Sequence, residues 1–163
     1  MGVYTLTAKG VALAATKDTE KTIAAIIGAD SAGVRGKIIG VEIGFPGDTV
    51  QDRAYGFSLQ RVNSNLSGDA GTPGTSVTAA NMVKQNTLAP NSTLSGGYDY
   101  SSEPGYDDEL WACELNGRNS LVREWNDDDA PEINQDQLIG LVGYPRTADA
   151  ADEVTVTITY KTV

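Results

Sequence analysis

The chain has 163 residues, a net charge of −10 and a hydrophobic fraction of 40%, which predicts one folded domain over residues 1–163. This acidic balance argues against nucleic acid and membrane partners, because phosphate backbones and anionic lipids attract clustered Lys and Arg. There is no histidine and one cysteine, Cys113, which excludes Ser-His-Asp and Cys-His catalysis and zinc sites with His ligands. We therefore expect a protein that is not an enzyme and binds no cofactor.

The N-terminal part of the chain reads as a series of strands. Residues 3–13 alternate apolar and polar side chains, and they predict a first strand or, within 1–14, an extended N-terminal arm, with a bulge at Gly10. Residues 22–27 favour a strand over a helical turn because Gly28 follows at once. Strands are also predicted at 36–45 and 54–62, with the odd-numbered and even-numbered residues of 36–45 on opposite faces.

The C-terminal part alternates strands with polar loops. The segment 154–161 alternates so strictly that its valines, Ile158 and Tyr160 are expected in the core, and its threonines and Lys161 in solvent. The pair Asn116-Gly117 is typical of a two-residue hairpin, so we expect 120–125 to pair with 110–115. A further strand is predicted at 138–144, loops are predicted at 63–76, 89–109, 126–135 and 146–152, and 77–88 is open between a short helix and a strand.

These elements predict an all-β fold. They amount to about eight strands with few or no helices, and consecutive strands without helical crossovers pair antiparallel. The expected architecture is an antiparallel β-sandwich of jelly-roll type, with long loops and an extended N-terminal arm. No basic and apolar leader opens the sequence, so we expect synthesis in the cytoplasm.

One acidic run is a candidate metal site. Asp127, Asp128 and Asp129 offer the oxygen ligands that calcium prefers. Glu132 stands where an EF-hand loop has its turn glycine, so a solvated acidic loop is the favoured interpretation.

Two other features invite a chemical interpretation. The acidic side chains of 89–109 neighbour tyrosines, as in some glycosidases, but tyrosines that pack over the sandwich or against a partner are the favoured interpretation. Cys113 alternates with Trp111 and Leu115, which indicates a small buried side chain rather than a nucleophile.

Several stretches together resemble a known family. They are YTLTA at 4–8 followed by VALAA at 11–15, KTIAAIIGA at 21–29, KIIGVEIGF at 37–45, LVREW at 121–125, and the threonine-alternating last strand. In order and length they are similar to the jelly-roll decoration (cement) proteins of tailed bacteriophages, whereas residues 98–109 match nothing in that family. The resemblance implies a structural virion protein on the outer capsid surface, a homotrimer that clamps neighbouring subunits of the major capsid protein.

Two segments are predicted to contact such a partner. Gly2, Val3, Tyr4 and Leu6 would add a strand to the sheet edge of a neighbour. Tyrosines suit interfaces, and the tyrosines predicted to serve in this way are Tyr98, Tyr100 and Tyr106. Two alternatives stay open: a carbohydrate-binding or receptor-binding β-sandwich, and another head or tail component.

Overall fold

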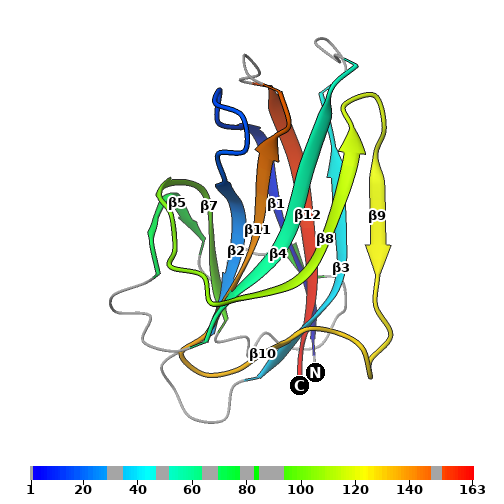
Figure 1. Ribbon diagram of the computed structural model, residues 1–163. Helices are drawn as coiled ribbons and strands as arrows, with labels where there is room; N and C mark the ends of the chain where they lie inside the picture. Colours follow the sequence, from blue (N-terminus) through cyan, green and yellow to red (C-terminus); the bar gives the residue numbers. More distant parts are fainter. Residues whose placement is uncertain are drawn as a thin grey trace.

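The computed structural model describes residues 2–28, 35–46, 52–63, 70–77, 83–84, 94–147 and 152–163. Within these ranges every regular element is a strand (Figure 1), and no helix of the described part is long and apolar enough to cross a membrane. The strands are β1 (Val3–Ala12), β2 (Lys21–Ile27), β3 (Gly36–Gly44), β4 (Ala54–Val62), β5 (Thr72–Val77), β6 (Val83–Lys84), β7 (Ser95–Ser102), β8 (Asp108–Asn116), β9 (Leu121–Glu124), β10 (Glu132–Ile133), β11 (Leu138–Pro145) and β12 (Glu153–Thr162).

The strands form two antiparallel sheets that pack face to face (Figure 1). Sheet A has the order β10-β3-β12-β1-β6, with β9 also paired to β3, and sheet B has the order β5-β7-β2-β11-β4-β8. Four pairs define the topology: β1 with β12, β2 with β11, β3 with β9, and β4 with β8. The first strand of the chain thus pairs with the last. The pairs inside them follow the same nested order, as in a long hairpin rolled up into two sheets. This is the jelly roll that the sequence predicts.

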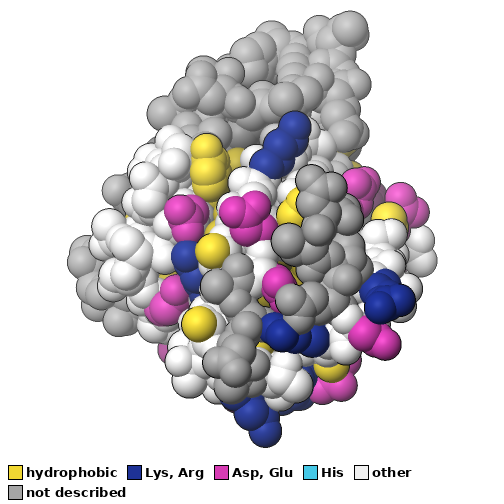
Figure 2. Space-filling view, turned by 90° about the horizontal axis from the view of Figure 1, so that it is seen from above, with side chains coloured by type: hydrophobic (Ala, Val, Ile, Leu, Met, Phe, Trp, Pro, Cys, Tyr) yellow, Lys and Arg dark blue, Asp and Glu magenta, His cyan; other side chains and the backbone are white. Residues whose placement is uncertain are grey.

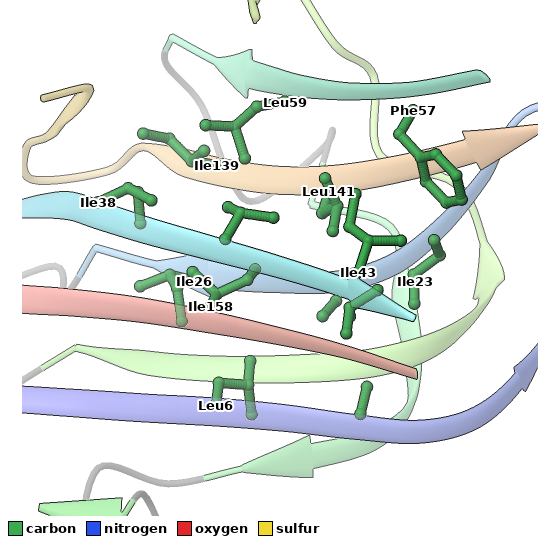
Figure 3. Close-up of a cluster of buried hydrophobic side chains, with 14 of the residues drawn as sticks. Leu6, Ile23, Ile26, Ile38, Ile43, Phe57, Leu59, Ile139, Leu141 and Ile158 are labelled. Carbon is green, nitrogen blue, oxygen red and sulfur yellow. The ribbon is translucent and has the colours of Figure 1, made fainter. Parts of the chain in front are cut away.

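Alternation of side chains builds the core between the sheets. In β12 the residues Val154, Val156, Ile158 and Tyr160 are buried, as the sequence predicts, and the tyrosine stacks on Tyr4 with ring centroids 5.4 Å apart. Figure 3 shows aliphatic side chains of both sheets meeting in this layer, Leu6 and Ile158 from sheet A and Leu59 and Ile139 from sheet B among them. Burying each such side chain contributes roughly 1.5–3 kcal/mol.

Two register shifts alter the predicted alternation. One lies between Ala8 and Val11, where Gly10 has φ +64, and it confirms the predicted bulge. The other lies between Thr159 and Tyr160 of β12, opposite β3. Because of this irregularity Ile38, Val41 and Ile43 are all buried, so the prediction that odd-numbered and even-numbered residues of this strand take opposite faces is wrong.

Four strands lie where loops or an open segment were expected. Residues 72–77 and 95–102 form the pair β5 and β7, which extends sheet B beyond β2, and 132–133 forms β10. The segment 77–88, open between helix and strand, contributes β6, which pairs with β1. Within these segments, residues 64–69, 78–82 and 85–93 lie outside the described residues. Glycine, serine and proline are poor strand formers, so these strands depend on the neighbours they pair with.

The expected hairpin between β8 and β9 does not form, although the turn itself does. Asn119 N–H donates to the Asn116 carbonyl oxygen at 2.8 Å, yet β8 pairs with β4 and β9 with β3. An Asn-Gly turn reverses the chain but does not choose the partner strand. Here the turn carries the chain from one sheet to the other.

The connection from β7 to β8 crosses the outer face of sheet B (Figure 1). Tyr106 hydroxyl lies 2.8 Å from Thr22 Oγ1, and the Thr22 amide donates to Glu103 at 2.6 Å. A small cluster, formed by Ala25, Val62, Tyr100 and Leu138, is buried beneath this connection. Sheet B is therefore covered on both faces at β2 and β11.

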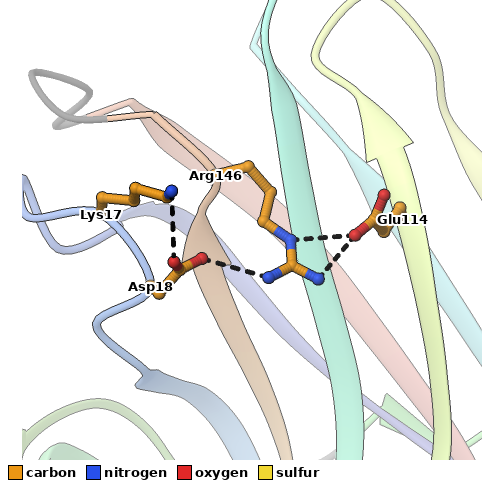
Figure 4. A network of polar contacts seen from close by, with 4 residues as sticks. All are labelled: Lys17, Asp18, Glu114 and Arg146. Atoms are coloured by element: carbon orange, nitrogen blue, oxygen red, sulfur yellow. Dashed lines mark hydrogen bonds and ion pairs between the residues drawn. The ribbon is translucent and has the colours of Figure 1, made fainter.

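One end of the sandwich carries charges of both signs. Arg146 donates to Glu114 at 2.6 and 2.9 Å and to Asp18 at 3.1 Å, and Asp18 also pairs with Lys17 (Figure 4). Figure 2 looks onto the sandwich from above and shows basic and acidic side chains intermixed on the described surface. Exposed pairs of this kind contribute little to stability, and they are typical of a solvated surface.

The packing of Tyr106 on β11 gives a direct test. A Cβ added at Gly140 would collide with the Tyr106 hydroxyl, whereas one added at Gly44 would meet no described residue within 4 Å. We expect Gly140→Ala to lower the free energy of unfolding by about 1–3 kcal/mol, the usual effect of overpacking, in urea denaturation. Gly44→Ala is the matched control and should be neutral or slightly stabilising. Equal effects of the two substitutions would contradict the covered outer face of sheet B.

Candidate interaction surface

The acidic run is held by lysines. The Asp127 carboxylate forms an ion pair with Lys161, and Lys37 Nζ donates to the Asp127 carbonyl oxygen at 2.6 Å. Lys161 is only 8% exposed, so the prediction that its side chain lies in solvent is wrong. Two ammonium groups at this loop oppose a divalent cation, and among the described residues no group of three His, Cys, Asp or Glu is placed to hold a metal. Asp128 and Asp129 are exposed, as in a solvated acidic loop.

The N-terminal residues lie inside the fold. Residues 3–12 form an inner strand of sheet A rather than an arm, and at Tyr4 and Thr5 it is paired on both sides, by β12 and by β6. Tyr4 is 2% and Leu6 3% exposed. Gly2 is buried and its amide donates to Thr162 Oγ1 at 3.0 Å, while Val3 is half-buried. Partner contact through Tyr4 and Leu6 would require the core to open.

The three tyrosines pack against their own chain. Tyr98 is half-buried against the main core, and Tyr100 and Tyr106 belong to the cluster on the outer face of sheet B. Burial, followed by the charge of Glu103, raises the pKa of Tyr100 to about 12. Burial also raises the pKa of Tyr106 above its usual range. Tyr100 and Tyr106 therefore pack beneath and within the β7–β8 connection on the outer face of sheet B, whereas the sequence left packing over the sandwich and contact with a partner both open.

Other candidate groups are similarly engaged. Asp107 accepts a hydrogen bond from the Asn63 amide at 2.7 Å, and Asp108 accepts one from Asn63 Nδ2 at 2.6 Å. Cys113 is half-buried, and burial raises the pKa of its thiol, which disfavours the nucleophilic thiolate. These contacts stabilise local structure.

The outer face of sheet A is different, and the sequence analysis did not single it out. Its central strands present threonines: Thr5 and Thr7 of β1 lie opposite Thr159 and Thr157 of β12, and the Thr7 and Thr157 hydroxyls are 3.0 Å apart. Thr7 is exposed and the threonines of β12 are half-buried. A stripe of five threonines without a charge, completed by Thr155, stands out in a chain with 21% charged residues. Charged residues are depleted at the cores of protein interfaces.

Glycines continue this threonine face onto β3. Gly40 lies opposite Thr159 of β12 and opposite Glu124 of β9. A Cβ at Gly40 would meet Thr159 Cβ and the Arg123 carbonyl oxygen at 3.6 Å, an ordinary contact distance, and one at Gly44 would meet no described residue within 4 Å. Neither glycine is required by close packing against the part of the chain that the structure describes. Glycine weakens a strand interior and often marks the close approach of a ligand or another backbone.

A groove lies over Gly40. Its volume is about 250 Å³, and it is lined by Ile39, Gly40 and Glu42 of β3, Val122 and Glu124 of β9, and Thr159 of β12, with Arg123 and Val41 completing it. Val122 is 63% exposed, one of two large hydrophobic side chains of the described chain that are so open. The threonine face and this groove together form the candidate interaction surface.

The strand edges are less suited to a partner. β5 carries Pro73 and β8 exposes Glu109 and Glu114 on the free edges of sheet B, devices that discourage edge-to-edge pairing. Between β8 and β9, Trp111 and Trp125 pack edge to face with centroids 5.8 Å apart, and the Arg123 guanidinium lies 5.3 Å from the Trp125 ring centroid. This aromatic contact closes the side of the sandwich.

The ion pair at Asp127 predicts a pH dependence. The hydrogen bond and the charge of Lys161 lower the pKa of Asp127. A lowered carboxyl pKa stabilises the fold above the unfolded-state pKa, and this contribution is lost as the pH falls through the lowered value. We expect Asp127→Asn to lower the melting temperature at pH 6, with the difference from the parent protein closing at acid pH. Asp128→Asn, the matched control, should show no such difference, and a difference for Asp127→Asn that persists unchanged at acid pH would contradict the ion pair.

Comparisons with known proteins identify no family for this chain. No family model and no curated protein matches the chain. A chain in a structure of deformed wing virus carrying the GFP gene is 12% identical with TM-score 0.36, over 96% of this chain and 74% of that chain. A chain of tomato aspermy virus is 12% identical with TM-score 0.34, over 99% and 77%. A chain of Desmodium yellow mottle tymovirus is 9% identical with TM-score 0.34, over 97% and 83%. These three descriptions name viruses and no bacteriophage, and likenesses this distant do not identify a function.

Proposed function

We propose that this chain is a structural virion protein that binds the outer surface of a phage head and stabilises neighbouring subunits of the major capsid protein. The observation that carries the proposal is the outer face of sheet A, where β1 and β12 present threonines and β3 adds two glycines on either side of Glu42, which lies opposite Thr157. Such a face is suited to contact with protein. The strand pairing of the jelly roll, a fold common in viral capsids, supports the same role.

The proposal includes a homotrimer, as the resemblance to decoration proteins implies. Three copies tied together bind a capsid through three contacts at once, and linkage makes weak single contacts effectively tight. The face of sheet A serves as the capsid contact, because the N-terminal strand and the three tyrosines are engaged within their own chain. No cofactor takes part.

A carbohydrate-binding module is the second candidate. Jelly rolls also occur in lectins, and Trp111 and Trp125 form an aromatic pair at the side of the sandwich with Arg123 beside them. Saturable binding to a glycan array that is lost on Trp125→Ala would favour this candidate. A different head or tail component would be distinguished by its copy number per particle, which is far lower for a tail part than for a decoration protein.

We expect the purified protein to have a mass near three times 17.1 kDa in light scattering and to co-sediment with mature heads of the phage that encodes it. Thr157→Lys places a long charged side chain in the middle of the threonine face, opposite Glu42 of β3, and should weaken sedimentation with heads by about tenfold or more, since its bulk would hold a partner off the sheet and break close packing at the contact. Ala112→Lys, which adds the same charge at an exposed position of β8 in sheet B, is the matched control and should bind as the parent does. A parent protein that stays with the supernatant at all concentrations would refute the proposal.

A further inference from the structure

We infer that the groove over Gly40 receives a cationic side chain, a Lys or Arg, from a basic protein surface. The inference rests on the proposed function for the class of partner, and it adds the chemistry of the contact. It begins from the size of the groove. At about 250 Å³ the groove lies below the usual range of small-molecule sites, about 300–1,000 Å³, so one long side chain is a suitable occupant.

The polar groups around the groove are mostly hydrogen-bond acceptors. Glu42 and Glu124 are exposed, they lie diagonally across the β3–β9 pair, and neither forms an ion pair or hydrogen bond with a described residue. Diagonal neighbours of this kind are about 7–8 Å apart, a span that a guanidinium with its five donors can bridge. The Arg123 carbonyl oxygen and Thr159 Oγ1 lie 3.6 and 3.9 Å from the position of a Cβ at Gly40, near the floor of the groove.

The one cation among the lining residues is held away. On β9, Val122 and Glu124 share the outer face with Glu42 and Gly40, whereas Arg123 pairs with the buried Val41 and stacks near Trp125. Its guanidinium therefore leaves the two carboxylates without a partner among the described residues. An incoming cation would supply the missing charge.

The walls suit the methylene stem of a long basic side chain. Val122 is 63% exposed and Ile39 half-buried, both beside the groove. Lys and Arg bury their stems on apolar surface while their charged heads contact polar groups. A Lys or Arg side chain in the groove would explain three features at once: the exposed Val122, the two carboxylates without a described partner, and a glycine at position 40. The net charge of −10 is complementary to a basic partner surface.

The test is an NMR titration of the ¹⁵N-labelled protein with a blocked Gly-Arg-Gly tripeptide. Its matched control is the same peptide with citrulline, which keeps the shape and lacks the charge. We expect saturable shifts of the Gly40 and Val122 amides with the arginine peptide, with an affinity in the millimolar range of about 1 mM, and none with citrulline. Equal shifts with both peptides, or no shifts at either amide, would overturn the inference.

Two variants locate the binding. Gly40→Val fills the groove and should abolish the shifts, and unchanged dispersion of the other amides would show that the fold is intact. Glu42→Gln with Glu124→Gln is nearly isosteric and should weaken binding by about tenfold or more. The control variant, Asp128→Asn with Asp129→Asn, removes the same number of charges from the exposed loop and should leave peptide binding unchanged. Undiminished binding by the glutamine variant would sink the inference.

The same variants separate this inference from the proposed function. If heads bind the parent and Gly40→Val equally well, the capsid role is upheld and the groove is shown not to contribute to it. Peptide binding by a protein that heads do not bind would uphold a cation site and refute the capsid role.

Discussion

The antiparallel ladder between β1 and β12 is the interaction on which the rest of this structure depends. It pairs Val3 with Lys161 and Ala12 with Glu153, so it joins the two ends of the chain in the middle of sheet A. The stacked rings of Tyr4 and Tyr160 lie beneath it. The entropic cost of closing so long a loop grows only with the logarithm of its length, and the buried side chains of both strands offset it. Residues 2–6 are committed to this ladder, which is why they are poor candidates for a partner.

The alternation of side chains along β1 and β12, with a period of two residues, creates the proposed interaction surface. Each valine or isoleucine that β12 turns inward leaves a threonine turned outward, and β1 places Thr5 and Thr7 beside them. Strand β3 adds Gly40 and Gly44 at positions where a side chain would fit. A β-branched residue there would raise strand propensity, and packing among the described residues does not require either glycine. A partner that approaches the sheet closely would explain glycine at both positions.

Much of the fold could be predicted from the sequence because local alternation determines it. The last strand, the first strand and its bulge at Gly10 all follow from side-chain pattern and a glycine. Which strands pair is a long-range property of the chain. The Asn116-Gly117 turn therefore does not indicate that β8 pairs with β4 and β9 with β3 rather than with each other. The strands β5 and β7 consist of weak strand formers, and their pairing with the sheet outweighs that preference.

The candidate site could be predicted less well, since exposure of a sheet face depends on what covers it. Both sheets have an outer face, but the β7–β8 connection with Tyr106 covers that of sheet B at β2 and β11. No local pattern in residues 98–109 predicts the contact between Tyr106 and sheet B. The bulge between Thr159 and Tyr160, which brings Gly40 beside Thr159 on the outer face, is likewise set by pairing with β3. Once the pairing is known, the threonines already visible in the sequence define the surface.

Hydroxyl-radical footprinting of the protein, free and bound to phage heads, tests the central claim most directly. Val122 lies on the proposed surface and Val163 at the chain end, and they are 63% and 60% exposed, so their intrinsic reactivities can be compared within one sample. If the outer face of sheet A contacts the capsid, Val122 becomes protected from oxidation on heads while Val163 keeps its reactivity. Oxidation of Val122 that is unchanged on saturated heads would contradict the account.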